Sequence, residues 1–346
     1  MPNPGYEAKV VDLGFNYPFP WNAYGRYFGQ GAPPGQEPEL GRWLEELEKN
    51  LELLRERLGM RVVRLFLLCN GWNYGHLDGD QFVPPALLHP AFVEDLGRLL
   101  AVFRARRMLV VPSLFDFKAF GRRFQRNGAG ERHAILHDEA MQRLVLRQTL
   151  SAFLEVSQNY REVIWAWEVM NEPVWNVTRF APRSAAGGKT TSASAMAAFL
   201  QQAVATIEQA GFPSTVGHRF ARDLSKYPTG TVRQFHFYPT GILRRALVDR
   251  ILPPFTATQA VLGEFGVQAP GEQGELWPEL GGADGGSTRR RTFSRLRHVR
   301  SKGYHLAFLW PDGIDGEGGR SLPPGADPLQ LSMQAQQGIE DFLART

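Results

Sequence analysis

The chain has 346 residues, and 43% of them are hydrophobic, enough to build one large core. Its 39 Lys and Arg residues against 35 Asp and Glu leave a net charge of only +4, spread along the sequence, which argues against a concentrated nucleic-acid-binding surface. No apolar run approaches the length of a membrane span, and the single cysteine, Cys69, excludes an internal disulfide and a cysteine-rich metal site.

Short apolar runs alternate with longer amphipathic stretches along the whole chain. The predicted strands cover residues 10–16, 62–67, 108–111, 163–170, 215–218, 232–237, 260–265 and 305–310. A helix is predicted over residues 40–58, where apolar side chains recur every three or four positions and Gly59 follows as a stop signal. Further helices are predicted around residues 92–103 and at 139–156, 195–209 and 329–343.

These eight strand–helix units, with no linker or repeat between them, predict a parallel sheet covered by helices. Eight units favour a single (β/α)₈ barrel over residues 1–346, since such barrels have about 250 residues. The residues beyond this usual size lie mainly after strands, in long loops that are expected on the C-terminal face, where substrates bind. An open doubly wound sheet is the alternative, but no glycine-rich turn follows the first strand, and residues 29–35 lead into no helix.

Glutamates stand at the ends of two strands that lie on opposite sides of the predicted barrel. The fourth strand ends in Trp-Glu-Val-Met-Asn-Glu-Pro, which carries Glu168 and Glu172, and the seventh ends in Leu-Gly-Glu-Phe-Gly, which carries Glu264. A buried ionised carboxylate is costly unless it is paired. Glu168 is therefore expected to be a structural partner of Arg64 or another cation. Two facing carboxylates, one protonated and one ionised, suit the cleavage of a glycosidic bond.

These segments resemble the clan A glycoside hydrolases, most closely family 5, which includes the endo-β-mannanases and cellulases. The resemblance runs from the first predicted strand to the eighth. It implies that Glu172, in the Asn-Glu-Pro motif, is the general acid/base and that Glu264 is the nucleophile of a retaining reaction. It also implies that Asn171 binds the sugar 2-hydroxyl and that Arg64 supports the nucleophile.

The same resemblance assigns residues on the sixth and eighth strands, and it has one departure. His236 and Tyr238 form a His-x-Tyr motif in which Tyr238 donates to the nucleophile, and Trp310 lies beneath the catalytic subsite. Many relatives carry a histidine at the end of the third strand that contacts the sugar. Here residues 112–117 read Pro-Ser-Leu-Phe-Asp-Phe, so Asp116 or an aromatic residue is expected in its place, which leaves the subfamily open.

Five of the eight tryptophans follow or end predicted strands. Sugar rings present apolar C–H faces that stack on aromatic rings, so this distribution favours an oligomeric carbohydrate as substrate. The tryptophans that follow or end strands are Trp21, Trp72, Trp175, Trp277 and Trp310.

The predicted function is a retaining hydrolase of β-linked, manno- or gluco-configured oligosaccharides or polysaccharides. An exo-acting β-glycosidase or transglycosylase and a carbohydrate-binding barrel without turnover are the alternatives. The chemistry requires no cofactor. No metal is expected, because His133 and His137 lack a third ligand and Asp312, Asp315 and Glu317 are typical of a solvated loop.

The sequence predicts no nucleic-acid or membrane partner and gives no indication of oligomeric state. Its first residues, Met-Pro-Asn-Pro, lack the charged and apolar regions of a signal peptide. A cytoplasmic location is therefore expected if the chain is complete, and a secreted one if a leader has been removed.

Overall fold

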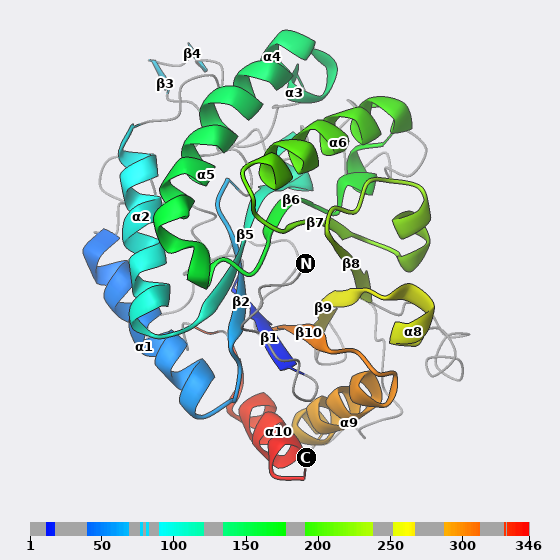
Figure 1. Cartoon of the computed structure of the whole chain (residues 1–346). Coiled ribbons are helices and arrows are strands. Elements are labelled where there is room, and N and C mark those ends of the chain that lie inside the picture. Colours follow the sequence, from blue (N-terminus) through cyan, green and yellow to red (C-terminus); the bar gives the residue numbers. More distant parts are fainter. Residues whose placement is uncertain are drawn as a thin grey trace.

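Eight parallel strands close into a barrel in which the spatial order follows the chain order (Figure 1). The computed structural model describes residues 12–17, 40–68, 77–78, 81–82, 90–120, 134–177, 191–237, 252–266, 287–311, 329 and 331–345. The barrel strands are β1 (Asp12–Asn16), β2 (Val62–Phe66), β5 (Leu109–Asp116), β6 (Trp167–Asn171), β7 (Ser214–His218), β8 (Val232–Phe237), β9 (Val261–Gly266) and β10 (Leu306–Trp310). Pairing of β1 with both β2 and β10 closes the ring. The predicted (β/α)₈ barrel is confirmed.

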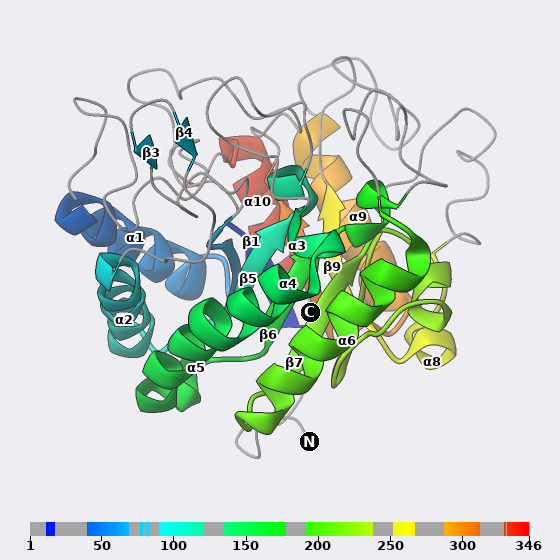
Figure 2. The same cartoon turned by 90° about the horizontal axis from the view of Figure 1, so that it is seen from above.

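Helices surround the ring of strands, and α1, α2, α5 and α6 follow one another along one side of it (Figure 2). The longer ones are α1 (Leu40–Glu56), α2 (Pro90–Ala105), α4 (Glu139–Leu144), α5 (Ser151–Ser157), α6 (Ala193–Gln209), α9 (Ser287–Ser301) and α10 (Met333–Leu343). Shorter elements are η2 (Phe117–Phe120), α3 (Ala134–His137), η4 (Val145–Leu150), η5 (Gln158–Val163), η6 (Pro173–Asn176), η7 (Ala221–Ser225) and α8 (Phe255–Thr258). A small antiparallel pair, β3 (Leu77–Asp78) with β4 (Gln81–Phe82), lies outside the barrel. Among the described helices, none has the length and apolar character needed to cross a membrane.

Several predicted boundaries were wrong. The strand predicted at 108–111 continues to Asp116, because Leu65 pairs with Pro112 and the residues beyond it are buried. The strand predicted from residue 163 begins at Trp167, since η5 occupies residues 158–163. The helix predicted at 139–156 is interrupted by the π-helical segment η4. The last helix begins at Met333, where Ser332 caps it by accepting a hydrogen bond from the Ala335 amide.

The barrel interior is apolar at one end and polar at the other. Val62, Val111, Val261, Leu306 and Phe308 form a buried apolar cluster. Because side chains on a strand alternate between the two faces, residues two positions further along the same strands also point inward. These inward positions include Arg64 on β2 and Ser113 on β5, which are both fully buried. The polar side chains therefore form a layer at the C-terminal ends of the strands, above an apolar floor.

Candidate active site

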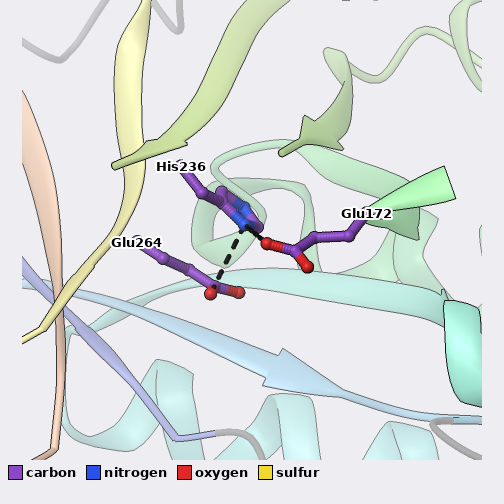
Figure 3. Close-up of side chains that lie close together, drawn as sticks. All are labelled: Glu172, His236 and Glu264. Carbon is purple, nitrogen blue, oxygen red and sulfur yellow. Dashed lines mark hydrogen bonds and ion pairs between the residues drawn. The ribbon is translucent and has the colours of Figure 1, made fainter. Parts of the chain in front are cut away.

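Three titratable side chains meet at the C-terminal end of the barrel, each from a different strand. Glu172 directly follows β6, His236 lies on β8 and Glu264 lies on β9, and the three point toward one another (Figure 3). The Nδ1 atom of His236 is 2.9 Å from Glu172 Oε1 and 3.3 Å from Glu264 Oε2. One ligand atom from each residue lies within 4.8 Å of the other two. The structure thus brings the two predicted catalytic carboxylates face to face.

The guanidinium of Arg64 connects this cluster to the rest of the polar layer. Its Nε and Nη2 atoms donate to the two oxygens of Glu168, each at 2.6 Å. Its Nη1 donates to Glu264 at 2.6 Å and to Asn16 at 3.0 Å, and its Nη2 also donates to Asn171 at 2.7 Å. All five N–H groups of the guanidinium are therefore used. The prediction that Glu168 is a buried partner of Arg64 is confirmed.

Burial and charge pairing act in opposite directions on this ion pair. Burial alone lowers the pKa of Arg64, but the charges of Glu168 and Glu264 outweigh it, and the net pKa is raised. Burial likewise raises the pKa of Glu168, yet the Arg64 charge and hydrogen bonds lower it overall. Glu168 also accepts from Ser113 at 2.9 Å and Gln234 at 2.8 Å. Its oxygens are thus committed to the protein, as befits a structural group.

Asn171, the last residue of β6, is held at both ends of its amide. Its Oδ1 accepts from Arg64, and its Nδ2 donates to Asp116 Oδ2 at 2.6 Å. Asp116 ends β5 and is 1% exposed. The residue that departs from the family pattern therefore touches Asn171 and fixes which way its amide points; a direct contact of Asp116 with sugar stays a prediction.

The backbone at Glu172 is left-handed, which aims this side chain away from the regular strand pattern. Its φ is +47°, a region that side chains other than glycine rarely adopt. The Glu172 amide donates to the Gly217 carbonyl at 2.7 Å, and the Glu172 carbonyl accepts from the Trp175 amide at 3.1 Å. These contacts on both sides of the peptide hold the unusual conformation.

The Glu172 carboxylate has three partners. His236 Nδ1 donates to Oε1, the Trp175 indole N–H donates to Oε2, and Arg219 Nε lies 3.5 Å from Oε1. Burial raises the pKa of Glu172, but the charge of Arg219 and the donors His236 and Trp175 lower it to about 2. The lowered pKa keeps Glu172 ionised in this state, and sequence reasoning did not place Arg219 beside it.

Hydrogen bonding accounts for the position of His236. Ionised carboxylates only accept hydrogen bonds, so the Nδ1 atom that faces both of them carries the proton. Among the described atoms, His236 Nε2 is buried without a hydrogen-bond partner. Glu172, His236 and Glu264 could hold a metal ion only if Nδ1 gave up that proton. The hydrogen-bonded form needs no metal and explains the same geometry.

The other predicted site residues fall into two groups. Trp310 ends β10 and is 8% exposed, and Trp175 lies in η6, where it contacts Glu172. Sugar stacking on either ring stays a prediction. Outside the described residues lie Trp21, Trp72, Trp277 and Tyr238, and the side chains of Cys69, His133, His137 and residues 312–317 are not described either.

Sequence reasoning missed four residues that complete the site. Asn16, the last residue of β1, donates to the Gly263 and Phe308 carbonyls and thereby ties the first strand to the ring. Ser113 and Gln234 were detectable as polar residues inside apolar strand runs at inward positions. Arg219 carried no such signal beyond its place directly after a strand.

The closed eight-stranded barrel confirms the resemblance at the level of the fold. No protein-family model and no curated protein matches the sequence. Among solved structures, the β-mannanase of the blue mussel Mytilus edulis is similar, with a TM-score of 0.64 and 16% identity over 97% of this chain and 92% of the mussel chain.

Two further solved structures are similar to this chain at comparable TM-scores and low sequence identity. The β-1,4-D-mannanase of Cryptopygus antarcticus has a TM-score of 0.66 and 15% identity, covering 96% of this chain and 90% of its own. The GH5_18 protein of Streptomyces cattleya has a TM-score of 0.64 and 12% identity, covering 98% of this chain and 81% of its own. At these identities the likeness concerns the fold.

Proposed function

We propose that the chain is a retaining glycoside hydrolase that cleaves β-1,4-linked, manno-configured oligosaccharides or polysaccharides. The observation that carries the proposal is the pair Glu172 and Glu264, which face each other from the ends of β6 and β9, with one oxygen of each carboxylate within 4.8 Å of the other. Retaining glycosidases hold their carboxylates about 5–5.5 Å apart, whereas inverting ones need about 6.5–9.5 Å to admit a water. We propose mannose rather than glucose as the sugar because the similar structures include β-mannanases.

In the first step, Glu264 attacks the anomeric carbon as the bond to the leaving oxygen breaks and Glu172 gives that oxygen its proton. Arg64 donates to Glu264 Oε1 and fixes the carboxylate for attack. The Asn171 amide, oriented by Arg64 and Asp116, supplies an N–H donor whose bond to the sugar 2-hydroxyl strengthens as charge develops. The product is a glycosyl ester on Glu264 and a free leaving group.

In the second step, Glu172 is the base. It removes a proton from water as the water oxygen attacks the anomeric carbon and the ester bond to Glu264 breaks. The ionised state that Arg219, His236 and Trp175 favour suits this step. The acid step requires Glu172 to take up a proton first, so we expect hydrolysis of natural substrates to increase toward acidic pH.

The proposal is tested by product analysis on mannan, glucomannan, a cellulose derivative and short β-1,4 oligosaccharides. The wild type should cleave a mannan internally, Glu264→Ala should abolish turnover, and Glu162→Ala on the exposed outer surface should leave it unchanged. Glu172→Ala should lose about 10²–10⁴-fold on natural substrates but retain the first step with activated aryl glycosides, which need little protonation.

The outcomes separate the alternatives. Release of monosaccharide alone from short oligomers would assign an exo-acting enzyme, and transfer to added sugar acceptors would assign a transglycosylase. Binding of oligosaccharides without any turnover by the wild type would contradict the proposal and leave a carbohydrate-binding barrel.

A further inference from the structure

Arg219 lies beside the proposed acid/base, Glu172. It immediately follows His218, the last residue of β7, and its Nε atom is 3.5 Å from Glu172 Oε1. Both side chains are shielded from solvent, at 14% and 10% exposure. The Arg219 guanidinium is 5.3 Å from the centre of the Phe220 ring, which also contacts Arg222 at 4.6 Å. These contacts hold the Arg219 charge near Glu172.

We propose that Arg219 is a positioning residue that keeps Glu172 ionised between turnovers and thereby sets the pH range over which Glu172 acts as an acid. The inference rests on the proposed function, since it concerns the same carboxylate. It assigns Arg219 no contact with the reacting atoms of the substrate.

Arg219 differs in charge from the other groups near the Glu172 carboxylate. Those that face or influence its carboxylate from the surrounding described elements are Trp175 (η6), Arg219 (after β7), Asp223 (η7), His236 (β8) and Glu264 (β9). Trp175 is a neutral donor, and His236 can donate as a neutral ring. Asp223 and Glu264 are acids, whose ionised forms oppose a charge on Glu172. Arg219 is the permanent cation of this group, so its removal leaves Glu172 in surroundings that favour the proton.

Kinetic pH profiles test the consequence. The acid step requires protonated Glu172, so kcat/KM on an unactivated β-mannooligosaccharide falls as pH rises through the pKa of Glu172. Arg219→Met should move this alkaline limb upward by about 1–3 pH units, and Arg219→Lys should keep it near the wild-type position. Arg222→Met is the matched control, because it removes an exposed charge from the same Phe220 ring without touching Glu172.

A second readout does not depend on turnover. In protein labelled with ¹³C at glutamate side-chain carboxyl carbons, Glu172→Gln identifies the Glu172 signal. The Glu172 midpoint should lie higher in Arg219→Met than in the wild type, with Arg219→Gln as a second variant and thermal unfolding as the check that each folds. Equal midpoints in the wild type and in every folded neutral variant would overturn the proposal. Absence of glycan hydrolysis by the wild type would instead contradict the glycosidase function, while the titration would still decide the role of Arg219.

Discussion

At the scale of single residues, the planar fork of Arg64 determines the arrangement of the site. Five N–H groups reach Asn16, Glu168, Asn171 and Glu264 at 2.6–3.0 Å, and the side chain is fully buried. A lysine offers three donors from one nitrogen and cannot serve all of these acceptors at once. The charge of Arg64 also offsets two buried carboxylates, so its contribution to stability is expected to be large.

Replacing Arg64 by methionine should leave Glu168 and Glu264 buried without their cation. We expect a loss of about 3–5 kcal/mol in the free energy of unfolding, measured by urea denaturation at pH 7. Arg143→Met is the control, since it breaks an exposed i,i+4 pair with Glu139 and should change stability by less than about 1 kcal/mol. Equal losses in the two variants would show that the buried pair does not stabilise the fold.

The glutamates of the site could be predicted because they stand in motifs at strand ends. A contact could be predicted only where a buried charge needs a partner of opposite sign. Arg64 with Glu168 is such a case, because a buried carboxylate on a strand requires a cation. The contact of Arg219 with Glu172 was not predictable, since an arginine directly after a strand can equally be exposed to solvent. The lowered pKa of Glu172 depends on that charge as well as on the donors His236 and Trp175, and was missed together with Arg219.

At the scale of elements, a shift in strand register and a glycine without a side chain make room for the polar layer inside the barrel. Simple alternation predicts that Glu168 and Glu172 share a face, but Asn171 also reaches Arg64, because the pairing of β6 with β7 shifts register between Glu168 and Asn171. Alternation in the sequence carries no mark of such a shift. Gly217 on β7 lies against the buried ion pair: an added Cβ would lie 2.9 Å from Glu168 Oε1 and 3.1 Å from Arg64 Nη2.

Gly217→Ala should therefore push the buried ion pair apart. We expect about 1–3 kcal/mol of destabilisation from overpacking, together with slower turnover in the proposed hydrolysis as Arg64 moves from Glu264. Gly41→Ala is the matched control, because nothing lies within 4 Å of its added Cβ in α1 and alanine favours a helix. Thermal unfolding of both variants measures the difference. A Gly217→Ala variant with the unfolding temperature of the wild type would contradict the packing argument.

At the scale of the whole molecule, His218, Glu168 and Glu172 all make the fold less stable as the pH falls. Burial lowers the pKa of His218 to about 4 from an ordinary value of 6.5, against a hydrogen bond with the Pro228 carbonyl. The unfolded chain therefore takes up this proton first, and stability falls as pH drops from about 6.5 to about 4. Glu168 and Glu172, whose pKa values are lowered, lose their stabilising contribution at still lower pH.

The free energy of unfolding should consequently decrease between pH 7 and pH 4. His218 accounts for up to about 3 kcal/mol of this decrease, and His218→Gln should flatten the curve in that range. Urea denaturation at pH 7, 5.5 and 4 measures the effect. The control is His305→Gln, which replaces an exposed ring that packs on Phe255. A curve that is equally steep in the wild type and in His218→Gln would contradict the assignment to His218.

The hydrogen bonds of Arg64 also bear on how the chain matures during synthesis. Arg64 is separated by 104 residues from Glu168 and by 200 from Glu264, and Asn16 bonds a carbonyl 292 residues away, at Phe308. An emerging nascent chain holds the guanidinium long before its last carboxylate leaves the ribosome. The two glutamates can therefore meet in a working arrangement only after β9 has been translated, and the bond that fastens β1 to β10 must wait longer still. The polar site is therefore completed late, when the ring of strands closes.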